Sequence, residues 1–250
     1  MKNAEELVAR CLELCEQRRM QEADELAQDG LAAFPEDGRL WQVQGIARWL
    51  LRDFARSQTC LEQATLLTPL FPLARCALAD LYFRSGRCDP ALTIYAAIAD
   101  DEQFPHSMLP MVASGLGRLG AHRLALKVCR RIARRNPEHH AALFGIAFYL
   151  CRLGYPVESY LGRLQQAHRL NPDMIAYRLN LAAAYFEQGH IELAHELVRN
   201  VEPAAVPCAC WLRRVQRILD LAGDDERAAA FEAELAARAR RGVADAGHGS

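Results

Sequence analysis

A feature that recurs every 34 residues constrains this chain more than any other. It is a glycine followed five residues later by a small residue, and it occurs as Gly86/Ala91, Gly120/Ala125, Gly154/Ser159, Gly189/Ala194 and Gly223/Ala228. Successive copies are 34 residues apart, except for one step of 35. Two earlier copies keep the small residue, as Ala23 and Ser57, with Arg18 and Arg52 in place of the glycine. A fixed period of this length indicates an array of structural repeats.

Composition narrows the class of protein. The 250 residues carry a formal net charge of −1, so no global basic surface marks the chain for nucleic acid or for a membrane. No run of about 18 apolar residues occurs, and the N-terminal residues lack the apolar core of a signal peptide. The 9 cysteines are an odd number without framework spacing, which fits buried thiols in a reducing compartment. We therefore expect a soluble cytoplasmic protein without membrane insertion.

The basic residues point to the source of the chain. Only Lys2 and Lys127 among its 30 lysines and arginines are lysine. This bias is typical of a GC-rich, bacterial genome, and it indicates nothing about function.

Each repeat is predicted to be a pair of helices. Apolar residues at helical spacing, as in Leu40-Val43-Ala47 and Leu73-Ala77-Leu81, favour helices, and β-branched alternation is absent. Glycine can end the first helix at positive φ, and a proline closes each of the first six repeats. The predicted repeats are 4–37, 38–71, 72–105, 106–139, 140–174, 175–208 and 209–242. The last repeat is a C-terminal cap of a single array over 1–242, and a disordered tail is expected over 243–250.

The fourth repeat departs from the others. Its first helix contains Pro110, Ser114, Gly115 and Gly117, which are all poor helix residues. We therefore expect a distorted helix or a bend in the array at this repeat.

These residues resemble the tetratricopeptide repeat, whose pattern is W-x2-L-G-x2-Y…A-x3-F…P. The segments that carry the resemblance are Trp41-x2-Gln44-Gly45, Leu78-Ala79-x2-Tyr82, Leu181-Ala182-x2-Tyr185, Ala91-x3-Tyr95 and the closing prolines Pro35, Pro69, Pro105, Pro137, Pro172 and Pro207. The resemblance covers nearly the whole chain. It implies an all-α, right-handed α-solenoid of about seven helix-turn-helix repeats.

The resemblance also implies a binding groove, because first helices line a concave surface in such proteins through places 2, 5, 9, 12 and 13 of each repeat. At place 13, Arg84, Arg118 and Arg152 recur 34 residues apart and predict a ladder of arginines. The aromatic residues mapped to the same surface are Trp49, Phe83, Phe144, Phe148 and Phe186. Arginine forks and aromatic anchors are typical of peptide-binding surfaces. The alternative is that each arginine only caps the carbonyls at a helix C-terminus.

Places 5 and 9 separate this chain from one subtype of these proteins. The carboxylate-clamp proteins use lysine and asparagine there, whereas this chain has Gln42/Ile46 and Cys76/Asp80. The clamp subtype is therefore not expected.

Other motifs are better explained by the repeats than by chemistry. Residues 115–120 read G-x-G-x-x-G, but no strand precedes them and Gly120 belongs to a repeat turn. His139-His140 and Cys208-x-Cys210 lack the further ligands of a metal site, and no serine, histidine and acid arrangement is readable. The basic run 130–135 is expected on a solvated convex face, with acidic or nucleic-acid contact as the alternative. We predict no catalytic residue, no cofactor and no metal.

The favoured hypothesis is a non-enzymatic interaction module or scaffold. It would bind a protein or peptide segment in the concave groove, with acidic groups of that ligand meeting the arginines, and it would not bind nucleic acid. The alternative is a bacterial secretion or assembly chaperone of the tetratricopeptide type. Homo-oligomerisation is left open, because Leu7, Leu12 and Leu14 place apolar side chains on more than one face of the first helix.

Overall fold

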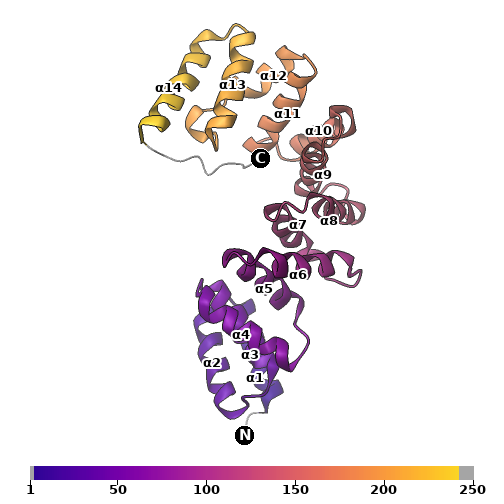
Figure 1. Ribbon diagram of the computed structural model, residues 1–250, viewed down its shortest axis with the longest axis vertical. Helices are drawn as coiled ribbons and strands as arrows, with labels where there is room; N and C mark the ends of the chain where they lie inside the picture. The colour runs from indigo at the N-terminus through magenta and orange to yellow at the C-terminus, as the bar shows by residue number, and fades with distance from the viewer. Residues whose placement is uncertain (1–2, 242–250) are drawn as a thin grey trace. The chain divides into compact units, whose positions relative to one another are not determined.

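The computed structural model describes residues 3–241, and these contain helices but no strand (Figure 1). Residues 242–250, which include the last residue of the predicted seventh repeat and the predicted tail, lie outside the residues that the structure describes. The helices follow one another as seven pairs: α1 (Ala4–Glu16) and α2 (Met20–Ala33), α3 (Gly38–Leu50) and α4 (Phe54–Leu67), α5 (Pro72–Arg84) and α6 (Cys88–Asp100), α7 (Leu109–Arg118) and α8 (His122–Arg135), α9 (His140–Arg152) and α10 (Leu161–Leu170), α11 (Ile175–Glu187) and α12 (Ile191–Val198), and α13 (Ala209–Leu221) and α14 (Asp225–Arg241). The expected all-α fold of helix-turn-helix repeats, of the α-solenoid class, is confirmed.

The chain forms two compact units, Met1–Val128 and Cys129–Ser250. The boundary between the two units falls inside α8. None of the helices within residues 3–241 combines the length and the hydropathy that a membrane span requires.

The turn inside each helix pair has one residue with left-handed backbone. Five of these residues are the periodic glycines, with φ of +77° at Gly86 and +70° at Gly120, for example. Arg18 and Arg52 adopt the same conformation, at φ of +60° and +65°. The turn geometry therefore persists where the glycine does not, at a conformational cost that only glycine avoids.

The small residues of the repeat pack inside the helix pairs, with one exception. The buried members are Ala23, Ser57, Ala91, Ala125, Ala194 and Ala228. Ser159 is exposed, because it lies in the short 3-10 helix Val157–Ser159 and α10 begins only at Leu161. The neighbouring Tyr160 is buried instead. Ser159 thus shares the period of the row but not its packing.

The fourth repeat corrects the expectation for Pro110. This proline lies in the first turn of α7, after the 3-10 helix His106–Met108, where its missing N–H costs no helical hydrogen bond. The helix is short, with 10 residues against 13 in α5, but Pro110 is its second residue and does not interrupt it. Gly115 has a packing role, since a Cβ there would lie 2.4 Å from Cζ of the buried Tyr95.

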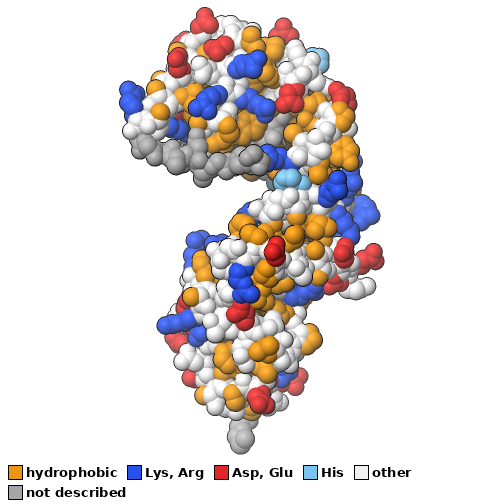
Figure 2. All heavy atoms as spheres, in the orientation of Figure 1, with side chains coloured by type: hydrophobic (Ala, Val, Ile, Leu, Met, Phe, Trp, Pro, Cys, Tyr) orange, Lys and Arg blue, Asp and Glu red, His pale blue; other side chains and the backbone are white. Residues whose placement is uncertain are grey.

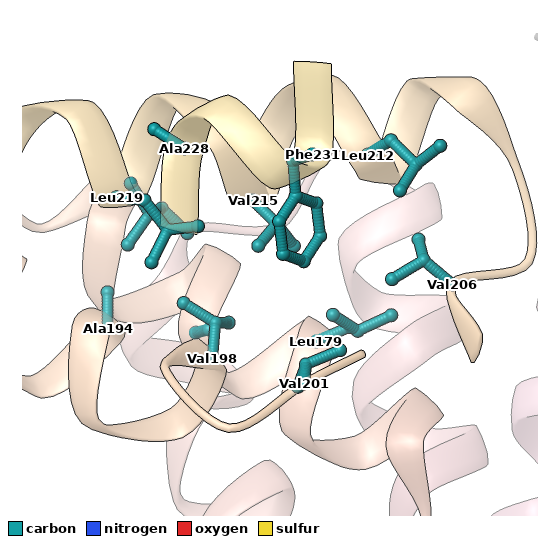
Figure 3. Packing of buried hydrophobic residues seen from close by; sticks show 12 residues of the cluster. Leu179, Ala194, Val198, Val201, Val206, Leu212, Val215, Leu219, Ala228 and Phe231 are labelled. Carbon is teal, nitrogen blue, oxygen red and sulfur yellow. The ribbon is translucent and has the colours of Figure 1, made fainter. Parts of the chain in front are cut away.

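The core of the C-terminal part of the second unit lies between α11, α12, α13 and α14 (Figure 3). Phe231 of α14 is completely buried, and its ring lies beside Val215 of α13. Beyond this face α14 exposes charged side chains such as Glu226, Glu232 and Arg240, and the predicted C-terminal cap stays a prediction.

Candidate functional site

In the first unit, side chains from three helices converge on the carboxylate of Asp80. Asp80 lies on α5 and is only 4% exposed. Its Oδ2 accepts hydrogen bonds from Nε1 of Trp49 (3.0 Å) and from Nε of Arg84 (2.6 Å), and its Oδ1 accepts one from Nη2 of Arg118 (2.5 Å). The structure therefore brings three of the predicted groove residues, one each from α3, α5 and α7, to a single acid.

Both arginines are also stacked on aromatic rings. The guanidinium carbon of Arg84 lies 4.4 Å from the ring centroid of Phe54, and that of Arg118 lies 4.6 Å from the ring centroid of Phe83. The arginine side chains nevertheless keep 44% and 39% of their surface exposed. Stacking and ion pairing thus fix two guanidinium groups that solvent still reaches.

The charge of this cluster is set by its hydrogen bonds. Burial acts to raise the pKa of Asp80, but the hydrogen bonds from Arg118, Arg84 and Trp49 outweigh it and hold that pKa below the ordinary value of 3.8. Asp80 is therefore ionised at neutral pH. Together with two arginines it leaves a net charge of +1.

In the first unit, two members of the predicted arginine ladder, Arg84 and Arg118, bind the same acid. Arg84 and Arg118 are the last residues of α5 and α7, where dipole capping was the alternative, yet these guanidinium groups bond the Asp80 carboxylate. Sequence reasoning placed Asp80 on the surface but missed its role. The signal was present, since Asp80 precedes Arg84 by four residues on one helix.

In this unit, predicted surface residues at places 5 and 9 of the repeats are buried and are not exposed to a ligand. Gln42, Ile46 and Cys76 are buried, at 0%, 3% and 0% exposed. The Gln42 amide donates to the carbonyl of Pro69 (3.1 Å) and accepts from the backbone N–H of Phe71 (2.5 Å). The accessible part of the predicted groove is therefore the set at the helix ends, which contains Trp49, Phe83, Arg84 and Arg118.

In the second unit, the predicted Phe144 and Phe148 form an aromatic surface on α9, and the predicted Phe186 lies on α11. Phe144, Phe148 and Phe186 are all half-buried. The Phe144 ring lies 5.9 Å from that of Phe148 and 4.6 Å from that of Tyr177, between centroids. Arg152 ends α9 and is exposed. Because Arg152 belongs to the other unit, a ladder of three arginines stays a prediction.

A small hollow adjoins this aromatic surface. Phe148 lines it together with Asn180 of α11 and Arg214 of α13. Alanines at 147, 183 and 184 leave the space, and an ion pair between Glu187 and Arg214 (3.3 Å) borders it.

Two further arginines were missed because the predicted places were not counted into the seventh repeat. Arg213 and Arg217 fall at its places 5 and 9 and are exposed. Arg217 lies 5.6 Å from the ring centroid of Phe186. Continuing the count along the sequence would have found both.

The surface is mixed in charge. Figure 2 shows acidic, basic and hydrophobic side chains interspersed over the helices of each unit. Within residues 3–241, no group of three or more His, Cys, Asp or Glu side chains is placed to hold a metal ion.

Comparison with known proteins finds similarity in structure. No family model matches the chain, and no curated protein matches it in sequence. Among solved structures, YrrB, a tetratricopeptide-repeat protein with an unusual peptide-binding site, is 13% identical with a TM-score of 0.59, over 70% of this chain and 90% of its own. Pseudomonas aeruginosa PilF is 14% identical with a TM-score of 0.66, over 83% and 93%. A tetratricopeptide-repeat protein of Parabacteroides merdae is 16% identical with a TM-score of 0.62, over 94% and 92%. At these identities the similarity concerns the fold.

Proposed function

We propose that this chain, which has the tetratricopeptide-repeat fold that its sequence predicted, is a protein-interaction module that binds a segment of another protein. One observation carries the proposal. Arg84 and Arg118 are fixed on aromatic rings by a buried acid and still expose their guanidinium groups. Rigid arginines beside aromatic rings are typical of the residues that dominate binding energy at protein interfaces.

The second unit supports the same function by different residues. Phe144, Phe148 and Phe186 are half-buried, so each ring is held by its own unit while part of it remains available to a ligand. Aromatic rings provide large contact areas for little loss of side-chain entropy. Arg152 at the end of α9 would add a charged contact. The fold similarity to YrrB, described as having a peptide-binding site, is consistent with a ligand of this kind.

A photo-crosslinking experiment tests the proposal without removing the site. A benzoylphenylalanine residue is introduced at Phe83, at Phe148 or at Leu66, a control position on α4 that is 78% exposed. We expect the same partner to be crosslinked in cells from Phe83 and Phe148 and not from Leu66. Crosslinking from Leu66 with none from the other two positions would place the interface elsewhere.

The alternative of an assembly chaperone uses the same surface with a different outcome for the partner. PilF and PilW are among the similar folds, and PilW is a type IV pilus biogenesis factor, which favours keeping this alternative. Co-expression separates the two, because a chaperone restores solubility to a partner that is insoluble alone, whereas a scaffold binds a partner that is already soluble.

A further inference from the structure

We infer that Arg84 and Arg118 form a preorganised receptor for one acidic side chain of the bound segment, and that Asp80 is the positioning residue that holds the receptor together. This inference rests on the proposed function and names the chemistry that the segment must carry. It assigns Asp80 a role in recognition although a ligand cannot reach its buried carboxylate.

Arg84 and Arg118 have N–H donors that Asp80 does not use. A guanidinium group has five N–H donors. Asp80 takes Nε–H from Arg84 and one Nη2–H from Arg118, and Arg118 has a further hydrogen-bond partner in Tyr95, so both arginines still keep donors for a ligand. Asp80 itself already accepts three hydrogen bonds, the third from Trp49. The site therefore has guanidinium N–H donors that can bind a further acceptor on a ligand.

The net charge of the cluster matches that of one carboxylate. Two arginines and one ionised aspartate leave +1, which a single carboxylate neutralises. A phosphate ester, with a charge of about −1.5 to −2, would overcompensate it. The ligand that suits the cluster is therefore an aspartate or glutamate side chain.

Both arginine side chains are held in place before a ligand binds. Holding a long, mobile side chain for a ligand costs conformational entropy. Here the cost is already met in the free protein, because each guanidinium lies between an aromatic ring and Asp80. The Trp49 N–H in turn fixes the orientation of the Asp80 carboxylate.

For Asp80→Asn, the hydrogen bonds of the cluster and its net charge predict opposite effects on the binding of acidic segments. Asp80→Asn raises the charge of the cluster from +1 to +2, which by itself would strengthen binding of an acid. An asparagine, however, must turn its NH2 group toward one of the donors, so it releases at least one arginine. We therefore expect Asp80→Asn to weaken binding of acidic segments.

The test uses two pools of immobilised random octapeptides with amidated C-termini, one with a central glutamate and one with a central glutamine. We expect the wild-type chain to prefer the glutamate pool by about tenfold, the scale of one charged hydrogen bond. Asp80→Asn should abolish that preference. The control Asp101→Asn removes a different acid–arginine pair of the same unit, that with Arg75 at 2.9 Å, and should keep the preference.

A second variant protects the test against misfolding. Arg118→Lys keeps the positive charge at an exposed position but loses the planar fork. It should retain the helical circular dichroism of the wild type while lowering the preference for glutamate severalfold.

Different results would overturn the proposed function and the inference about the arginines on Asp80. Binding of neither pool above a glycine–serine background would overturn the proposed function and this inference with it. Equal binding of both pools by the wild type, or an undiminished preference in folded Asp80→Asn, would overturn the inference alone.

Discussion

Single residues show where the repeat tolerates a change and where it does not. Arg52 occupies the turn position that glycine holds in five other repeats, with φ of +65° against +77° at Gly86. The periodic pattern predicts a turn at both places, because the small residue five positions later is kept. It does not reveal that an arginine accepts the left-handed backbone, which depends on the helices on either side of the turn.

This difference predicts opposite effects of two substitutions. Arg52→Gly should raise the free energy of unfolding by about 0.5–1 kcal/mol, because it relieves a left-handed residue at the cost of some chain entropy. Gly86→Ala should lower it by about 1 kcal/mol, since no neighbouring atom lies within 4 Å of the added Cβ and the effect is purely conformational. Urea denaturation followed by circular dichroism measures both. Equal effects of the same sign would contradict the explanation.

The lowered pKa of Asp80 predicts that the folded chain loses stability at acidic pH. Its pKa is held below 3.8 in the folded chain, so its ion pairs stabilise the fold above the unfolded-state pKa and are lost as the pH falls through the lowered folded-state value. Below about pH 3.8, wild type should therefore lose stability more steeply than Asp80→Asn. Thermal denaturation of both proteins between pH 3 and pH 7 tests this, and parallel curves would show that Asp80 contributes no such dependence.

At the scale of elements, the sequence predicts helices and turns better than it predicts contacts. Helical spacing and the glycine period suffice for the seven pairs of helices. The late start of α10 was not predicted, because Ser159 keeps the small-residue spacing while Tyr160 takes the buried place. The bond between Arg118 and Asp80 joins residues 38 positions apart, which no short-range pattern reveals.

The α6–α7 contact predicts a specific sensitivity to size. Gly115→Ala would place its Cβ within 2.7 Å of three atoms of the Tyr95 side chain, which is buried. We expect a loss of roughly 1–3 kcal/mol in the free energy of unfolding. Gly162→Ala in α10 is the control, because its Cβ meets no atom within 4 Å, and it should be neutral or slightly stabilising. A loss of similar size in both variants would point to a general effect of glycine replacement.

For the whole molecule, the fold and the specificity have different origins. Structures only 13% to 16% identical to this chain share its fold, so the helix pairs tolerate very different surface residues. We propose that the choice of partner depends on the side chains that the pairs present. In the first unit the proposed residues are the arginines on Asp80, and in the second unit they are the phenylalanines of α9 and α11.

The most direct test of the central claim is the affinity of the crosslinked partner, measured by isothermal titration for the wild type, Arg118→Ala and Arg56→Ala. Arg56 is a matched control, since it is an exposed arginine of the same unit, on α4, whose side chain is 75% exposed. The account predicts that Arg118→Ala raises Kd by about tenfold or more and that Arg56→Ala leaves it unchanged. An unchanged Kd for folded Arg118→Ala would contradict the claim that this chain binds its partner through the arginines on Asp80.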